Sequence, residues 1–484
     1  MLFNSYGFIY LYLPVVFIGF FVLGRRNRTV AAGWLAAASL FFYGWWSSLY
    51  VPLLLGSVVF NFGIGYWLGH ASLPDRRRAI LIFGVAADLL LLAYFKYADF
   101  FIQSWNQVSG SSFPMLGVVL PLGISFFTFT QIAFLVDVYR GIAREYRFVH
   151  YLLFVTYFPH LIAGPVLHHK QMMPQFADAS VYRPQVEKIA IGLALFIVGL
   201  SKKVLLGDNF ASLADPVFAA AAHGGAVLPA DAWMAALAYT FQLYFDFSGY
   251  SDMAIGLSLL FGIRLPINFD SPYKARSIAD FWRRWHMTLS QFLRDYLYIP
   301  LGGNRYGTSR RYLNLLLTML LGGLWHGANW TFVAWGALHG ALLTLNHATR
   351  PLVQRLLPAW ARDSRVFVIT CIAATFVCVV CAWVLFRAET FSAAATMLAA
   401  MAGFSPARAH SLLAAKTALP WLALGSMVVW GLPGSQRFCG YLIDAAHSRF
   451  ALPFNRRAAV LLGCVCCLVL MNLGKISPFL YYQF

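Results

Sequence analysis

The chain has 484 residues, of which 60% are hydrophobic and only 11% are charged. Soluble globular domains carry about 25% charged residues, so the composition excludes an ordinary soluble protein and predicts a polytopic membrane protein. Lysine and arginine outnumber aspartate and glutamate by 36 to 18, which gives a net charge of +18. Basic cytoplasmic loops account for such an excess in membrane proteins, so we expect a lipid bilayer and no nucleic acid as partner.

The first predicted span covers residues 8–26, which lack the basic start of a cleavable signal and end at two arginines. Basic clusters follow one another along the first part of the chain, at 25–28, 75–78 and 139–147. Two apolar runs separate each cluster from the next, near 30–46 and 51–69, and then near 80–95 and 115–137. Because an even number of crossings returns the chain to the same side, we expect all three clusters in the cytoplasm and the N-terminus outside.

We expect one all-α membrane domain over residues 1–484, with roughly 11 to 13 transmembrane or re-entrant helices around a central funnel or tunnel. Two segments suggest the funnel because they are too short or too polar for simple spans: 158–176 and 264–311. Irregular backbone is tolerated at membrane depth only where protein buries it or where it lines a watery cavity. We expect the histidines of the first segment to hydrogen-bond unwound backbone: His160, His168 and His169.

The segment 264–311 carries nine Lys or Arg against three Asp. Within it, large apolar residues recur at spacings of three or four: Phe281, Trp285, Leu289, Phe292 and Tyr296. This period predicts an amphipathic helix at the cytoplasmic interface. Three arginines lie off the apolar stripe: Arg283, Arg284 and Arg294. They either anchor the helix to lipid headgroups or dock an anionic cytosolic partner, such as the phosphates of coenzyme A or an acidic carrier protein.

Two further patterns are interpreted as structural. The motif FDFSGYSD at 245–252 lacks the GxSxG form of a nucleophile elbow, so we interpret it as a helix-packing segment. The seven cysteines lie mostly in apolar runs, and the cluster at 464–467 has neither CxxC spacing nor a neighbouring histidine. We therefore predict no metal site, no disulfide framework and no bound cofactor.

The stretch GGLWHGANW at 322–330 places His326 inside some of the most apolar sequence of the chain. Ionisable residues are expensive to bury within membrane proteins, which makes them candidates for function. Burial favours the neutral imidazole that a general base needs, and Asn329 could orient the ring through a hydrogen bond. On spacing alone, a satisfied core histidine is the competing interpretation. His339 and His347, on the following apolar run, are interpreted as structural.

Long stretches of the chain are similar to a known family: LLAYFKYADFF (91–101), LPLGISFFTF (120–129), FPHLIAGPV (158–166), QLYFDFSGYSDMAIGLSLLFGI (242–263), FWRRWHMTLSQFLRDYLYIPLGGNR (281–305) and LLGGLWHGANW (320–330). Through them the chain resembles the membrane-bound O-acyltransferases (MBOAT), specifically the bacterial alginate O-acetyltransferase-like branch. The resemblance implies the MBOAT fold and two histidines at one tunnel. The histidine of LWHG, His326, would be catalytic, and that of WRRWH, His286, would be catalytic or would gate or orient the donor.

The resemblance also implies an activity. It suggests an O-acetyltransferase of the bacterial cytoplasmic (inner) membrane that takes acetyl from a cytosolic thioester, either acetyl-CoA or an acetylated carrier protein. The acetyl would be relayed for O-acetylation of an exopolysaccharide of alginate or cellulose type, with periplasmic acetyltransferase or relay proteins as partners. His326 would deprotonate the acceptor hydroxyl, and Asn329, Trp325 and Trp330 are candidate donors to the oxyanion.

Two competing interpretations remain for the activity. A transporter or channel for an acyl donor or glycan would need no covalent step, but the sequence lacks the internal repeat that transporters often show. A lipid acyltransferase of the same superfamily is disfavoured by the long motifs shared with the polysaccharide branch.

The C-terminal segment 475–484 bears on the acceptor. It ends in FLYYQF, in which Phe479, Tyr481 and Phe484 fit the pattern F-x-Y-x-x-F. This resembles the C-terminal motif of a small partner peptide in the D-alanylation branch of the family, whose tyrosine is proposed to carry the acyl group. We therefore hypothesise that Tyr481 carries the acetyl group. The alternative is an aromatic anchor at the membrane interface.

Overall fold

The computed structural model of the chain describes residues 1–143, 147–162, 164–405, 410–442, 451–474 and 479–480. The regular elements of these residues are helical, and no strand occurs among them. Contacts between residues group the chain into two compact units. Unit 1 contains Met1–Leu200, Tyr250–Ile267 and Cys439–Pro478, and unit 2 contains Ser201–Gly249, Asn268–Phe438 and Phe479–Phe484.

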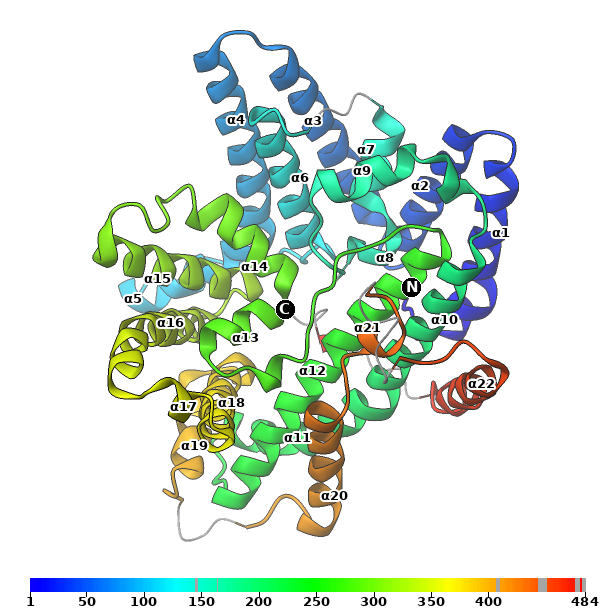
Figure 1. Cartoon of the computed structure of the whole chain (residues 1–484). Coiled ribbons are helices and arrows are strands. Elements are labelled where there is room, and N and C mark those ends of the chain that lie inside the picture. The colour runs from blue at the N-terminus through cyan, green and yellow to red at the C-terminus, as the bar shows by residue number, and fades with distance from the viewer. Residues whose placement is uncertain (144–146, 163, 406–409, 443–450, 475–478, 481–484) are drawn as a thin grey trace. The chain divides into compact units, whose positions relative to one another are not determined.

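Unit 1 is built mainly from the first half of the chain, coloured blue to green in Figure 1. Its elements in chain order are η1 (Phe8–Tyr12), α1 (Leu13–Gly24), α2 (Arg28–Gly44), η2 (Ser48–Tyr50), α3 (Val51–His70), α4 (Pro74–Leu92), η3 (Ala93–Tyr97), α5 (Ala98–Ser109), α6 (Ile124–Tyr139), α7 (Phe148–Thr156), α8 (Phe158–Leu161), α9 (His169–Ala177), η4 (Ala179–Tyr182), α10 (Val186–Ser201) and, near the C-terminus, α22 (Arg456–Met471).

Helices α3, α4 and α6 pack closely in unit 1 because small residues stand at their contacts. A Cβ atom on Gly65 would lie 2.4 Å from Cε1 of Phe134, and one on Gly84 would lie 2.7 Å from Cδ1 of Leu135. Two polar side chains inside this group are bonded to each other, since the Asn61 amide donates to Oδ1 of Asp88 at 2.7 Å, while Oδ2 of Asp88 has no hydrogen-bond partner among the described residues. This arrangement is the expected one for ionisable groups buried among membrane helices.

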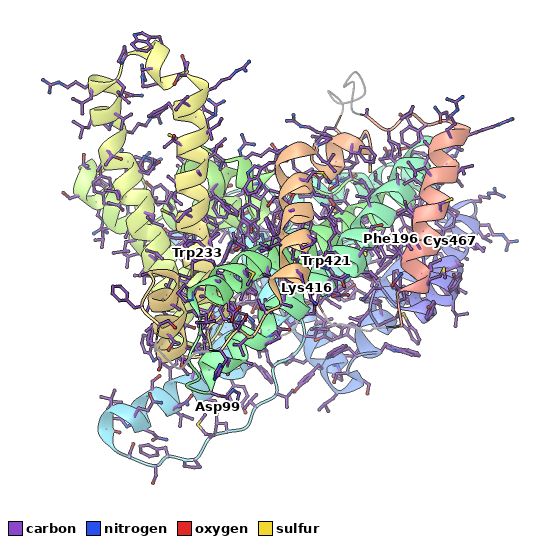
Figure 2. The ribbon with its side chains drawn as sticks, turned by 90° about the horizontal axis from the view of Figure 1, so that it is seen from below. Asp99, Phe196, Trp233, Lys416, Trp421 and Cys467 are labelled. Carbon is purple, nitrogen blue, oxygen red and sulfur yellow. The ribbon has the colours of Figure 1, made fainter. Side chains whose placement is uncertain are left out.

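The apolar run near 115–137 is only partly helical. Its first residues form an extended loop, and the helix α6 begins at Ile124. The carboxylate of Asp99, labelled in Figure 2, accepts the backbone amides of Leu116 and Gly117 at 2.6 and 3.0 Å. These two bonds hold the loop against α5, which explains why a continuous span over this run is wrong.

Unit 2 contains the second half of the helices, green to orange in Figure 1. Its elements are η5 (Lys202–Gly207), α11 (Asp208–Ala222), most of α12 (Pro229–Leu260), η6 (Pro272–Lys274), α13 (Ile278–Arg284), α14 (Met287–Leu293), η7 (Arg294–Tyr298), α15 (Gly307–His326), α16 (Trp330–Leu356), α17 (Ala359–Arg362), α18 (Arg365–Arg387), α19 (Phe391–Met401), α20 (Ala415–Ser426), η8 (Met427–Gly431) and α21 (Ser435–Phe438).

The helices α15 and α16 lie side by side in unit 2 (Figure 1). Their backbones approach so closely that a Cβ atom on Gly323 would lie 2.3 Å from the Phe332 carbonyl oxygen, and one on Gly336 would lie 2.3 Å from that of Met319. Only glycine fits at such contacts, since neither carbonyl can move without breaking its helix. The close pairing fixes the end of α15, where His326 is the last helical residue.

The amphipathic helix predicted within the segment SIADFWRRWHMTLSQFLRDYLYIPLGG (277–303) is wrong as a single element. The chain forms α13, then breaks at Trp285 and His286, and continues as α14 and the π-helical η7. His286 has a φ of +44°, which no α-helix accepts. The predicted apolar stripe is buried inside the protein at Phe281, Trp285, Leu289 and Phe292, so the fold of unit 2 rather than a membrane surface sets its geometry.

Among the described residues, four helices are long and apolar enough to cross a bilayer: Ser48–His70, Pro74–Ser109, Val186–Ala222 and Arg365–Arg387. Shorter apolar helices cover Phe8–Gly24, Ile124–Tyr139 and Phe391–Met401. The predicted multi-pass, all-α architecture is therefore confirmed. The described residues of the segment 158–176 form the short helices α8 and α9 with irregular backbone between them. The His160 ring bonds, at 2.9 Å, the carbonyl of Phe154, which belongs to the last turn of α7 and not to the unwound backbone that was expected.

Candidate functional site

The two histidines singled out by the sequence lie together in unit 2. His326 ends α15 and His286 precedes the first residue of α14, and their ring centroids are 6.3 Å apart with the planes tilted by 60°. Both are buried, with 5% of His326 and none of His286 exposed. Two imidazoles at this separation can contact the same small reacting group from different sides.

Aromatic rings enclose this histidine pair. Trp325 contacts both rings, with its centroid 5.0 Å from His326 and 6.2 Å from His286. Trp335 and Phe386 stand edge-on to His326, each with a centroid distance of 5.2 Å. Such walls limit the access of water and lower the local dielectric, which strengthens every electrostatic interaction within them.

The backbone at His286 is strained. Among the described non-glycine residues, only Ser271 and His286 have a positive φ. Such a conformation costs on the order of 1–3 kcal/mol and persists only where the surrounding structure imposes it. The hydrogen bond from the Met287 amide to the Asn268 carbonyl, at 3.0 Å, is part of that surrounding structure and holds the backbone at His286 in this conformation.

Asn268 determines which nitrogen of His286 carries the proton. Its side-chain oxygen accepts from the Thr288 amide at 3.3 Å and from the Thr288 hydroxyl at 2.9 Å, and His286 Nδ1 lies 3.2 Å from it. A backbone N–H can only donate, so the atom that it meets is the carbonyl oxygen of the asparagine. Nδ1 of His286 therefore carries the hydrogen, and the lone pair of the neutral ring lies on Nε2.

The sequence interpretation missed Asn268 because it stands 18 residues before His286. The signal that could have revealed it is a polar amide within the short apolar stretch LPINF, just ahead of a turn at Ser271. Only the pairing of the segment around Asn268 with the break between α13 and α14 brings the two side chains together.

The side chain of Asn329 makes different hydrogen bonds from the one to His326 that we expected. Its side-chain oxygen accepts the Thr331 amide at 3.0 Å, and its side-chain nitrogen donates to the Glu389 carbonyl at 2.9 Å. The oxygen therefore caps α16, and the nitrogen ties the start of that helix to the loop between α18 and α19; neither bond is to the His326 ring. The one-turn spacing misled because α15 ends at His326 and a new helix starts at Trp330.

A substitution of Asn329 distinguishes a helix-capping role of this residue from a catalytic one. Changing Asn329 to alanine should lower stability by about 1 kcal/mol through loss of the cap, while kcat changes by less than about twofold in the folded protein. The thermal midpoint and the steady-state rate of the same detergent-purified sample measure both effects. Asn329→Ser keeps a capping oxygen and serves as the control. A loss of kcat in both variants at normal stability would restore the catalytic interpretation.

The tryptophans differ in how closely they approach the histidine pair. Trp325 is 4% exposed and contacts both rings, whereas Trp330 is 48% exposed at the first position of α16. Trp335, which the sequence interpretation did not consider, is buried and packs against His326. Its indole nitrogen has no hydrogen-bond partner among the described residues, so it is an available donor beside the ring.

His339 belongs to the same aromatic cluster but has a structural contact. It is fully buried, and its Nδ1 accepts the Trp282 indole N–H at 3.3 Å. This agrees with the structural role expected for it and provides a comparison for His326 within one environment.

The three arginines of the predicted docking surface are not equivalent. Arg284 donates to Asp280 at 2.9 Å, and Arg294 pairs with its neighbour Asp295 at 2.7 Å. The hydrogen bond to Asp295 raises the pKa of the Arg294 guanidinium. Arg283 is exposed at the end of α13. Exposure leaves Arg283 and Arg294 accessible, so docking of an anionic partner on them stays a prediction.

Two further predictions concern the acyl carrier Tyr481 and the absence of a metal site. Tyr481 lies outside the described residues, although Phe479 and Leu480 just before it are described. Among the described residues, no group of three or more His, Cys, Asp or Glu side chains is placed to hold a metal ion. Among the described side chains, imidazoles and aromatic rings meet at the histidine pair.

Comparison with known proteins adds an independent finding. The model of the membrane-bound O-acyltransferase family matches residues 89–386. The chain is 44% identical over 440 residues to a peptidoglycan O-acetyltransferase of Helicobacter pylori, covering 84% of this chain and 80% of that one. It is 41% identical to a probable alginate O-acetylase, AlgI, of Pseudomonas putida, over the full length of both chains. A teichoic acid D-alanyltransferase of Streptococcus thermophilus is 31% identical over 237 residues, which are 47% of this chain and 57% of that protein.

Proposed function

The chain belongs to the membrane-bound O-acyltransferase family and is an acyltransferase, and from this premise we propose that it transfers acetyl from a cytosolic thioester toward the hydroxyl groups of an extracytoplasmic polysaccharide. The observation that carries the proposal is the buried pair of His326 and His286 within aromatic walls. A dry site protects a thioester from hydrolysis until an acceptor hydroxyl arrives.

In the proposed reaction, His326 acts as the general base. It takes the proton of the acceptor hydroxyl as the oxygen attacks the thioester carbonyl, so that a C–O bond forms and the C–S bond breaks. The imidazolium then returns the proton to the departing thiolate, which leaves as a thiol. Such proton transfer contributes about 10²- to 10⁴-fold, and the remainder comes from positioning and from donors to the oxyanion. The unbonded indole N–H of Trp335 is a candidate for such a donor, beside Trp325.

His286 is proposed to contact the donor. With the hydrogen on Nδ1 facing Asn268, the lone pair of the neutral ring lies on Nε2, which is the hydrogen-bond acceptor of His286. A role in orienting the donor predicts that changes at His286 raise KM, whereas a role in proton transfer predicts that they lower kcat. The donor is acetyl-CoA or an acetylated carrier protein. The exposed Arg283 provides positive charge suited to either, whereas the charge of the exposed Arg294 is already paired with Asp295.

The proposed place of the protein is the bacterial inner membrane, with periplasmic acetyltransferase or relay proteins completing the transfer. The names of the relatives divide between alginate and peptidoglycan, and cellulose is the third polymer considered. Alginate has the greater support, because that name accompanies similarity over the whole chain. Chemical analysis of the O-acetylated polymer in cells that carry the protein distinguishes the three.

Tyr481 is proposed as the intermediate acyl carrier. A phenol has a pKa of about 10, so imidazole removes its proton more easily than that of an aliphatic alcohol, and its ester is a better onward donor. Changing Tyr481 to phenylalanine should abolish the labelled acyl-protein adduct formed from radiolabelled acetyl thioester, and should reduce polysaccharide acetylation by more than about tenfold. Tyr482→Phe is the matched control and should leave both signals unchanged. Normal acetylation by Tyr481→Phe at normal expression would remove the carrier role.

A further inference from the structure

A buried lysine stands at the start of unit 2 with two carboxylates around it. Lys203 lies on η5 with 2% of its side chain exposed, and its Nζ is 2.6 Å from Asp246 of α12 and 2.7 Å from Asp208 of α11. Asp246 is itself 4% exposed. Burying charges is unfavourable unless they are paired with good geometry, so these three groups hold one another in place. We call Lys203, Asp208 and Asp246 the Lys203 cluster.

The helices meet at this cluster because of local backbone features. The π-helical turn of η5 carries the lysine, and π-helical turns are frequent at functional sites. Gly207 follows, where an added Cβ atom would lie 3.4 Å from the backbone nitrogen of Asp246. Gly207 thus brings the end of η5 into contact with the backbone of α12 at Asp246. Asp246 belongs to FDFSGYSD, so its ion pair is a role that the helix-packing interpretation of that motif missed.

The C-terminal tail contacts the same cluster. The backbone amide of Leu480 donates to Oδ2 of Asp246 at 2.9 Å, while Oδ1 of that carboxylate faces Lys203. The Lys203 ammonium also stands 5.0 Å from the centre of the Phe479 ring, within range of a cation–π interaction. Phe479 is 1% exposed and Leu480 is 6% exposed. One carboxylate thus joins the lysine to the main chain of the tail.

We propose that the Lys203 cluster is a docking site for the C-terminal tail that fixes the register of Phe479 and Leu480, the two residues that precede Tyr481 in the sequence; its importance for acyl transfer rests on the proposed carrier function of Tyr481. The hydrogen bond is to a backbone amide, so a slip by one residue would present a different amide to Asp246. The Phe479 ring on the lysine opposes such a slip. Phe247, which follows Asp246 on α12, has its ring 4.8 Å from that of His286, so the helix that binds Leu480 also contacts the histidine pair. Anchoring a residue next to an acceptor raises the effective concentration of that acceptor.

The experiment measures hydrogen exchange of the Leu480 amide in the full-length protein in detergent, by mass spectrometry of C-terminal fragments. Asp246→Ala should speed the exchange of this amide by about tenfold or more, because it removes the acceptor. Asp246→Asn keeps an oxygen at the same place and should retain part of the protection. Asp215→Ala is the control, since it removes from α11, the helix that also carries Asp208, a carboxylate that pairs with Arg387, and should not alter the exchange.

If substitutions of Asp246 prevent folding, a substitution at Phe479 in the tail can test the docking site instead. Phe479→Ala removes only the ring over Lys203 and should also speed exchange at Leu480, whereas Phe479→Tyr keeps the ring and should not. Unchanged exchange in folded Asp246→Ala and Phe479→Ala would overturn the docking site. Tyr481→Phe should keep full protection at Leu480 while the acyl-protein adduct is lost. If that variant transfers acetyl normally, the carrier role fails, and the exchange data still decide the docking site.

Discussion

Replacing His326 by glutamine should lower the rate of acetyl transfer by about 10²- to 10⁴-fold, the contribution of a general base. Glutamine has a similar length and can hydrogen-bond, but it cannot take up and release a proton near neutral pH. KM should change little, because the base acts in the transition state rather than in donor binding. The measurement is the initial rate with purified protein, an acetyl thioester and an acceptor.

His339→Gln is the matched control for this experiment. His339 is fully buried in the same aromatic cluster, 4.8 Å from the Trp335 ring that also packs against His326. The glutamine side-chain oxygen can still accept the Trp282 indole N–H, so the variant should keep activity within about threefold. Equal losses of kcat in both variants would mean that the aromatic cluster tolerates glutamine at neither position. That result would contradict a specific catalytic role of His326.

Replacing Asn268 by alanine should reduce both stability and kcat. Its oxygen serves three donors, His286 Nδ1 and the amide and hydroxyl of Thr288. Each buried donor left without a partner costs about 1–3 kcal/mol, so the loss reaches several kcal/mol. In the folded fraction, His286 would no longer be fixed in one tautomer, and kcat should fall by about tenfold or more. Thermal unfolding and kinetics on the same sample measure the two effects.

Two comparison variants make the Asn268 prediction specific. Thr288→Val removes one donor and leaves the His286 bond in place, so it should affect stability without the loss of kcat. Asn268→Asp keeps an oxygen toward Nδ1 and should recover more activity than Asn268→Ala. If Asn268→Ala matches the wild-type protein in unfolding temperature and kcat, the tautomer assignment is wrong.

The proximity of the two histidines was predictable from the family resemblance, since the spacing around His326 alone favoured a core histidine. His326 and His286 stand in long, specific motifs, and the structure places their rings 6.3 Å apart. Membrane helices were also predictable, because about 20 apolar residues identify a span wherever it packs. The structural role of His339 followed from its place on an apolar helix, and its bond to Trp282 agrees with it.

The errors arose where tertiary contacts determine the local structure. The break at His286 has neither proline nor glycine to announce it, since the pairing with Asn268 imposes the conformation. Asn329 was assigned by helical spacing across a point where one helix ends and another begins. The Lys203 and Asp246 pair joins residues far apart in the chain, and neither residue reveals its partner by periodicity. Such pairings need coordinates.

The most direct test of the account is the O-acetyl content of extracellular polysaccharide from cells that carry His326→Gln, with protein levels matched to wild type. Mass spectrometry counts acetyl groups per sugar unit. The account predicts that acetylation falls to the level of a deletion strain, while His339→Gln retains it. Polysaccharide acetylated at the wild-type level by His326→Gln would contradict a mechanism in which acetyl reaches the polymer through this imidazole.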